Sequence, residues 1–325
     1  MIDAETAGQR LDNFLLTRLK GVPRSHVYRL IRSGQVRVNS GRAAAHYRLR
    51  SGDKVRIPPV RRPGAVPAPA TPGGLDWLEQ RIVFEDERLL VLDKPAGMAV
   101  HGGSGVGLGC IEALRSLRPD AKTLELVHRL DRATSGCLLV AKKRSTLRAL
   151  HALLRGGAIE KRYLALLKGD WQHGRHRVDA PLERIEGSHA ERVRVAESGK
   201  AATSEFRLIE SFGIASLVEV SIDTGRTHQI RVHAAHVGHP VAGDERYGDA
   251  ALNAALARYG LRRMFLHAHV VAFQWPDTDA EFEISVPLPE DLKDVLEALN
   301  ENSSAPKDRG PRRAKSRRPR SRAGP

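Results

Sequence analysis

The sequence has few cysteines, few aromatic residues and no long apolar run. Its two cysteines, Cys110 and Cys137, are too few for a disulfide framework or a cysteine-rich zinc site, which favours a reducing compartment. No apolar stretch reaches the length that a membrane-spanning helix needs. The opening MIDAETAGQRLDNF also lacks the basic, apolar and small-residue zones of a signal peptide. We therefore expect a cytoplasmic protein with no membrane partner.

Acidic residues are scarce at the two ends of the chain. The net charge is +15, and residues 1–60 hold 12 Lys and Arg against 4 Asp and Glu. Residues 307–325 hold 9 against 1, whereas residues 63–306 are slightly negative. A nearly neutral body with basic ends suits binding to a polyanion such as RNA. An anionic membrane is disfavoured because no basic amphipathic helix with a large apolar face is present.

Composition and periodicity divide the chain into four segments. They are a small N-terminal module at 1–60, a linker rich in Pro, Ala and Gly at 61–74, a larger domain at 75–300 and a tail at 301–325. The larger domain mixes strand-like and helix-like patterns, which predicts an α+β fold. The tail consists mainly of Ser, Pro and Arg, so it cannot bury a core and we expect disorder there.

Basic residues cluster in the N-terminal module with almost no acids among them. Helical patterns cover residues 10–19 and 25–34, and two short strands are predicted to follow them. One interpretation is an ordinary solvated face. We favour an RNA-binding surface, because almost no acidic residues lie among the basic ones. Its candidate residues are Arg24, Arg29, Arg32 and Arg37.

An acid interrupts an apolar, strand-like segment in LVHRLDRATSGCLLVAKK (126–143). Asp131 lies where two buried runs meet, and a buried carboxylate is costly unless another group pairs with it. The alternative is that Asp131 merely caps the turn formed by the following Thr-Ser-Gly. The segment therefore predicts either a turn residue or a functional carboxylate.

Two further segments allow a functional and a structural interpretation. KPAGMAVHGGSGVGLG (94–109) is rich in glycine but fits neither a nucleoside triphosphate loop nor a dinucleotide fingerprint, so we expect a flexible loop near the active cleft. EKRYLALL (160–167) is strand-like and carries Tyr163. Most such tyrosines are core residues, and stacking on a base is the competing role.

Histidines recur in GRTHQIRVHAAHVGHP (225–240) at a spacing that could hold a metal ion on a helix. No acidic or cysteine partner lies nearby in the sequence, and Arg226 and Arg231 would repel a cation. We therefore favour a strand-to-helix segment that presents Arg231 to an acid, and we predict no metal site. The histidines concerned are His228, His233, His236 and His239.

The order of these motifs resembles that of a known enzyme family. HRLDRATSG, KRYLA, GRTHQIRVH and FLHA (265–268) follow one another as in the pseudouridine synthases that modify ribosomal and transfer RNA. The N-terminal module resembles the alpha-L RNA-binding domain of a small-subunit ribosomal protein. The resemblance runs from about Gly8 to about Pro289. It implies a catalytic domain built on a mixed, largely antiparallel sheet with flanking helices.

The resemblance also implies roles for individual residues. Asp131 matches the catalytic carboxylate, Arg231 the arginine that pairs with it, and Tyr163 the tyrosine that stacks on the uracil. Leu266 matches the apolar residue on the other side of the ring, and Arg129 the residue that fills the space left by the flipped base. Lys161, in the same motif as Tyr163, is expected to contact the substrate.

The implied reaction isomerises uridines in large-subunit (23S) rRNA within a monomeric enzyme that needs no cofactor. Three alternatives stay open at this point. A related synthase could act on other rRNA positions or on tRNA. A non-catalytic ribosome-assembly factor would share the basic module but would not need Asp131, Tyr163 and Arg231 together. A metal-dependent hydrolase would need acidic ligands beside the histidines.

Overall fold

The computed structural model describes most of the chain. It covers residues 1–3, 6–19, 22, 24–60, 74–102, 108–121, 123–185 and 192–304, the side chains of residues 24, 25, 303 and 304 excepted. The predicted linker lies outside these residues except for Gly74, and so do residues 305–325 of the predicted tail. Within the described part of the chain, no helix is long and apolar enough to cross a membrane.

The N-terminal module has a hydrophobic core of its own. It is built from α1 (Leu11–Arg18), α2 (Arg24–Arg32), β1 (Arg37–Val38) and β2 (Val55–Arg56). The two strands pair antiparallel. The apolar stripe of the first helix is buried, with Leu11 and Leu15 completely enclosed. Gly34 follows α2 with a φ of 72°, a left-handed conformation that ends helices and suits glycine.

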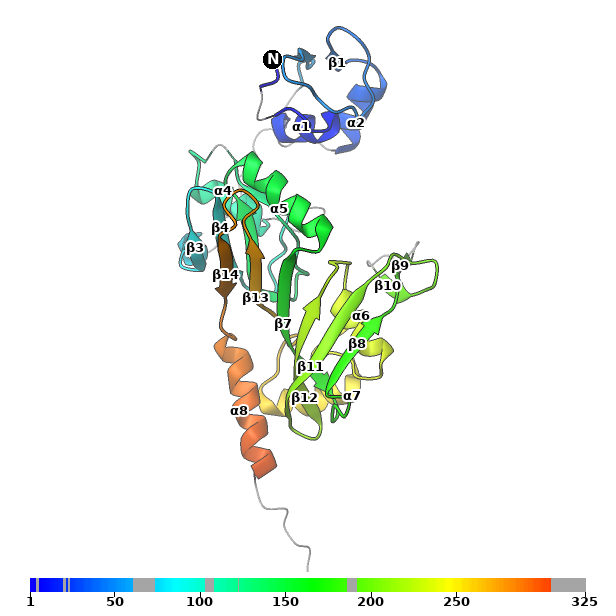
Figure 1. Ribbon diagram of the computed structural model, residues 1–325, viewed down its shortest axis with the longest axis vertical. Coiled ribbons are helices and arrows are strands. Elements are labelled where there is room, and N and C mark those ends of the chain that lie inside the picture. The colour runs from blue at the N-terminus through cyan, green and yellow to red at the C-terminus, as the bar shows by residue number, and fades with distance from the viewer. Residues whose placement is uncertain are drawn as a thin grey trace, which may run out of the picture.

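A single large sheet organises the rest of the described chain (Figure 1). Its path is β3-β4-β6-β13-β7-β12-β11-β8, with β5 added beside β6 and β14 beside β13. Only the β6–β13 pair is parallel among the described pairings, so the predicted mixed, largely antiparallel sheet is confirmed. The strands are β3 (Ile82–Glu85), β4 (Leu89–Lys94), β5 (Glu125–Leu126), β6 (Ser135–Ala141), β7 (Ile159–Lys168), β8 (Arg175–Asp179), β11 (Thr203–Ser211), β12 (Ala215–Ile222), β13 (Leu266–Gln274) and β14 (Glu281–Ser285).

Helices flank this sheet, and a small hairpin extends from it. Figure 1 shows α5 beside the half that contains β4 and β13, and α6 and α7 beside the half that contains β11 and β12. The helices are α3 (Asp76–Glu79), α4 (Cys110–Leu117), α5 (Arg144–Gly156), α6 (Gln229–His236), α7 (Ala250–Leu256), a 3₁₀ turn η1 (Ala257–Tyr259) and α8 (Glu290–Ser304). The hairpin pairs β9 (Leu182–Ile185) with β10 (Arg192–Val195). The predicted α+β class is thereby confirmed.

Helix α8 extends further than the sequence indicated. Its apolar side is anchored by the buried Leu292, Val295 and Leu299. The helix continues through a polar stretch as far as Ser304. The tail that we expected from residue 301 therefore starts no earlier than residue 305, because a packed helix can carry another polar turn at little cost.

Candidate active site

The loop that carries Asp131 connects β5 to β6, and buried polar contacts hold it in place. The Thr134 N–H donates to the Asp131 carbonyl oxygen at 3.1 Å, which closes the turn. The carbonyl oxygen of Arg132 accepts from Gly97 N at 2.8 Å and from Lys94 Nζ at 3.2 Å. Lys94 is fully buried, and this burial lowers its pKa to about 8. Hydrogen bonds from Gly97 and from the buried Lys94 thus hold the turn that interrupts the apolar run.

Gly136 explains why a glycine follows this turn. Its φ is 107°, and a Cβ atom there would lie 2.1 Å from the carbonyl oxygen of Ala268 on β13. No side chain fits in that space, so only glycine lets β6 approach β13 this closely. The Thr-Ser-Gly sequence therefore serves the parallel strand pairing as well as the turn.

Arg231 of α6 holds two carboxylates at once. Its Nη1 donates to Asp131 Oδ2 at 3.0 Å, while Nε and Nη2 donate to the two oxygens of Asp244 at 2.7 and 2.9 Å. Arg231 and Asp244 are both buried, whereas the side chain of Asp131 is 24% exposed. The fork-like pair with Asp244 fixes the guanidinium, so that its remaining edge faces Asp131. The predicted presentation of Arg231 to an acid is confirmed.

Asp244 belongs to the site through its pairing with Arg231, and the sequence analysis did not predict it. Burial alone would raise its pKa, but Arg231 and the backbone N–H groups of Arg246 and Tyr247 hold that pKa below its ordinary value. Those N–H groups donate to Asp244 Oδ1 at 2.8 and 3.2 Å. The sequence offered no signal beyond an acid after a glycine, because the pairing depends on how α6 packs against the segment that follows it.

Asp131 opens into a cavity of about 1100 Å³ with a strongly basic wall. Ala96, Gly97 and Val100 of the glycine-rich segment line one side, as predicted for that loop. A cavity with this wall would attract a polyanion, and Asp131 is the carboxylate that Arg231 presents in it. The arginines of the wall are Arg129, Arg132, Arg192, Arg231, Arg246, Arg262 and Arg263.

Comparison with known proteins identifies the family. Residues 88–236 match the family described as RNA pseudouridylate synthase, and residues 9–55 match the S4 domain. "Ribosomal large subunit pseudouridine synthase C" of Pasteurella multocida is 52% identical over 94% of this chain and 94% of its own. The protein of the same name from Yersinia pestis is 51% identical over 93% and 96%. This chain belongs to the RNA pseudouridylate synthase family.

The solved structures agree with this assignment. "Human RNA Pseudouridylate Synthase Domain Containing 1" has a TM-score of 0.53 at 27% identity and covers 71% of this chain and 97% of its own. "Human RNA Pseudouridylate Synthase Domain Containing 4" shares the fold with a TM-score of 0.58 at 24% identity, covering 70% and 95%. The protein is thus an RNA pseudouridine synthase, an isomerase, with an N-terminal S4 domain.

The synthase has two of its predicted site residues in the core rather than on the cavity wall. Tyr163 on β7 is 7% exposed and Leu266 on β13 is 3% exposed, in the same hydrophobic cluster as Leu130 and Ile230. Burial raises the pKa of the Tyr163 hydroxyl, and the nearby charge of Asp131 raises it further. Tyr163 therefore lies close to the carboxylate, whereas its contact with a uracil stays a prediction.

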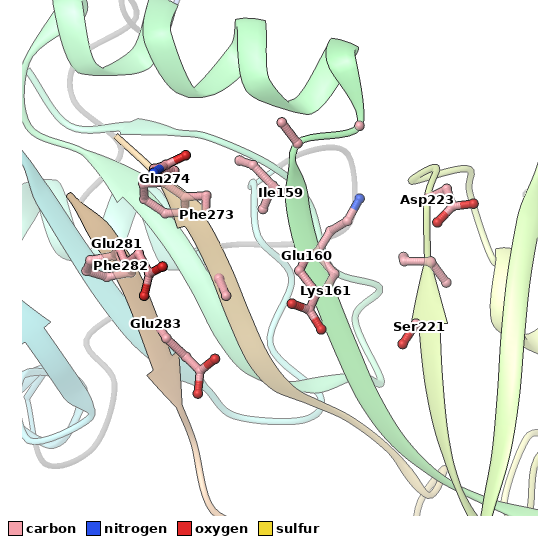
Figure 2. Close-up of a pocket in the computed structure, with 14 residues that line it drawn as sticks. Ile159, Glu160, Lys161, Ser221, Asp223, Phe273, Gln274, Glu281, Phe282 and Glu283 are labelled. Atoms are coloured by element: carbon pink, nitrogen blue, oxygen red, sulfur yellow. The ribbon is translucent and has the colours of Figure 1, made fainter. Parts of the chain in front are cut away.

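Lys161 lies in a different hollow (Figure 2). This groove of about 550 Å³ runs over β7, β12, β13 and β14 and is lined by four carboxylates. Burial lowers the pKa of Lys161, and Asp223 across the groove opposes that shift. Lys161 is not among the residues that line the cavity around Asp131, so its contact with substrate stays a prediction. The carboxylates are those of Glu160, Asp223, Glu281 and Glu283.

The N-terminal arginines that we predict to bind RNA differ in how exposed their side chains are. Arg29 and Arg32 are exposed on α2 of the S4 domain. Arg37 on β1 is half-buried, and its Nη1 donates to the carbonyl oxygen of Ser40 at 3.3 Å. The Arg24 side chain lies outside the described atoms. Arg29 and Arg32 are thus placed to meet a polyanion.

Three histidines of residues 225–240, His228, His233 and His239, make separate contacts, and His236 is exposed. His233 is buried, with Nδ1 at 2.9 Å from Ser204 Oγ and Nε2 at 2.9 Å from the carbonyl oxygen of Ala180. His239 Nδ1 lies 2.7 Å from the carbonyl oxygen of Lys168. Among the described residues, no three His, Cys, Asp or Glu side chains are placed to hold a metal ion.

Proposed function

We propose that this synthase isomerises specific uridines of large-subunit rRNA to pseudouridine, with Asp131 as the catalytic carboxylate. The name of the relatives supports the substrate, since identity is 52% over 94% of the chain. The observation that carries the residue assignment is the 3.0 Å contact between Asp131 and the buried Arg231 in the basic cavity. The proposal extends to a monomeric protein in the cytoplasm.

The isomerisation of uridine requires one carboxylate and a site from which water is excluded. The bond between C1′ of the ribose and N1 of uracil breaks, and a bond between C1′ and C5 forms. C5 loses a proton and N1 gains one, so substrate and product have the same composition and no cofactor is needed. Asp131 can act as the covalent catalyst or base in such a rearrangement. Arg231, fixed by Asp244, orients the carboxylate before the RNA arrives.

The uridine must leave its stack to reach Asp131. We propose that Tyr163 and Leu266, which are diagonal neighbours in the β7–β13 pairing, contact the two sides of the extruded ring. Arg129, exposed on the cavity wall, fills the space that the base vacates. We propose that Lys161, two residues before Tyr163 on the same face of β7, contacts the substrate.

RNA is held at two places in this proposal. The arginines of the cavity contact phosphates close to the target nucleotide, and those of the S4 domain contact phosphates at a distance. Arg29 and Arg32 are the exposed members in the S4 domain, with Arg24 and Arg37 beside them in the sequence. Phosphate contacts of this kind set the register of the RNA without reading its bases.

The test is pseudouridine mapping on deproteinised large-subunit rRNA. The wild-type protein should modify a few discrete uridines, and Asp131→Asn should modify none while still binding the RNA. Asp120→Asn is the matched control, because Asp120 is exposed and does not line the cavity around Asp131. Turnover by a clean Asp131→Asn preparation would refute the residue assignment. Modification of tRNA or small-subunit rRNA alone would refute the substrate.

A further inference from the structure

His228 has an unusual backbone conformation beside the catalytic carboxylate. It precedes α6 with φ 54° and ψ 21°, a left-handed conformation in which few residues other than glycine occur. Its side chain is 8% exposed, and Nε2 lies 3.9 Å from Asp131 Oδ2. Backbone strain of this kind persists only where surrounding contacts maintain it, and it is concentrated at functional sites.

Tyr247 contacts the Nδ1 nitrogen of His228. The backbone N–H of Val193 on β10 donates to the Tyr247 hydroxyl oxygen at 2.9 Å. The hydroxyl keeps its own proton for donation, and His228 Nδ1 lies 2.9 Å from its oxygen. A neutral imidazole that accepts at Nδ1 carries its own proton on Nε2. That proton faces Asp131.

The rest of the Tyr247 environment ties this arrangement to Arg231. The Tyr247 ring meets the His228 ring edge to face, with centroids 5.5 Å apart. The guanidinium carbon of Arg231 lies 5.0 Å from the centroid of the same tyrosine ring. His228 immediately precedes α6 and Arg231 lies in its first turn, and both side chains point to Oδ2 of Asp131. The two donors therefore approach Asp131 as one unit.

We propose that His228 is a positioning residue for Asp131 and that Tyr247 sets its tautomer. This inference rests on the proposed function of Asp131. Arg231 Nη1 and His228 Nε2 both approach Oδ2 of the carboxylate, at 3.0 and 3.9 Å. Oδ1 is thereby the oxygen offered to the substrate. When RNA closes the cavity, the Nε2–H completes a second hydrogen bond to Oδ2 and stops the carboxylate from rotating.

The first test needs no RNA. In a nitrogen NMR spectrum of the full chain with labelled histidine, the His228 signal is assigned by its loss in His228→Asn. The signal should have the Nε2–H pattern in the wild type, and Tyr247→Phe should convert it to a mixture of tautomers. An Nδ1–H pattern in the wild type, or no change in Tyr247→Phe, would overturn the proposal.

The second test measures turnover. Asparagine tolerates the left-handed backbone, but its shorter side chain cannot present a donor to Asp131. His228→Asn should lower kcat by about 100-fold, as a misplaced catalytic group does, with KM and Tm unchanged. His236→Asn, on the exposed side of the same helix, is the matched control and should behave as wild type. An unchanged kcat in His228→Asn, or a loss that follows a fall in Tm, would overturn the proposal.

Tyr247→Phe keeps the ring and removes only the hydroxyl. It should lower kcat by less than His228→Asn does, and it should lower kcat no further in the His228→Asn background. Independent, multiplicative losses would show that Tyr247 does not act through His228. If the wild-type protein does not modify large-subunit rRNA, the proposed substrate fails, while the NMR measurement still decides the tautomer.

Discussion

The two hollows of the catalytic domain have opposite charge. The cavity around Asp131 is walled by arginines, and two of its three acids, Asp131 and Asp244, are held by the buried guanidinium of Arg231. The groove in Figure 2 is lined by carboxylates, and two of them, Asp223 and Glu283, have side chains more than 60% exposed. A chain with a net charge of +15 thus has one hollow that attracts RNA and one that repels it.

The two hollows also differ in how far their charged side chains are buried. In the groove, water screens each carboxylate, so exposed ion pairs such as Arg162 with Glu283 contribute little to stability. In the cavity, Arg231 and Asp244 are removed from water, and the loss of one partner leaves the other charge uncompensated. We therefore expect substitutions to have large effects in the cavity and small ones in the groove.

The largest effect is expected from Asp244→Asn. This change leaves the buried Arg231 guanidinium without its main carboxylate, which should cost about 3–5 kcal/mol of unfolding free energy. Pseudouridine formation should fall with it, because Arg231 is then free to turn away from Asp131. Urea unfolding and rRNA mapping measure the two effects. Glu283→Gln in the groove is the matched variant, and its unfolding free energy should change by no more than about 0.5 kcal/mol. Equal losses in the two variants would show that the cavity and the groove do not differ in this way.

The next largest effect expected is a loss of stability at acid pH, caused by histidines whose pKa burial lowers. Burial lowers the pKa of His267 to about 4, although Val286 accepts a hydrogen bond from its ring. Between pH 6.5 and 4 the unfolded chain binds a proton that the folded chain does not. The contribution of His267 to the free energy of unfolding should therefore be fully retained above pH 6.5. It should fall by about 1.4 kcal/mol per pH unit between pH 6.5 and 4. His128, whose pKa burial also lowers to about 4, should add a similar loss.

Urea unfolding at several pH values, with exposed His236→Asn as the control, measures this effect. His267→Gln removes one titrating group, so its stability should depend less steeply on pH than that of the wild type. The control should keep the wild-type slope, because an exposed histidine has no burial cost to relieve. A pH slope in His267→Gln equal to that of the wild type would contradict the assignment of a neutral, buried His267.

The smallest expected effect concerns the salt dependence of RNA binding. Arg192→Ala removes one exposed cation from the cavity wall, which should reduce the log–log salt slope by about one unit if the residue contacts a phosphate. Glu160→Ala in the groove should leave the slope unchanged. RNA affinity measured at several salt concentrations tests both variants. Tighter binding and a steeper slope with Glu160→Ala would show that RNA passes over the groove.

Several features of the site could be predicted from local sequence. Asp131 was identifiable because it interrupts an apolar run, and the resemblance to a family matched it with Arg231. The structure confirms that pairing at 3.0 Å. Asp244 could not be predicted, since its contact with Arg231 depends on the packing of α6. Lys161 is assigned to the substrate by its motif, and it lies in the other hollow because it is close to the start of β7, although it shares a face of the strand with Tyr163.

Local sequence patterns were enough to predict the helices of the N-terminal module, the basic ends of the chain and the carboxylate at residue 131. These features depend on periodicity, composition and short motifs, which are properties of neighbouring residues. The groups that face Asp131 depend on how the chain packs. Arg231 lies 100 residues further along the chain, and the tautomer of His228 depends on a tyrosine and on a backbone amide from another strand. Such contacts arise when strands and helices pack, because packing brings together polar groups that no local pattern connects.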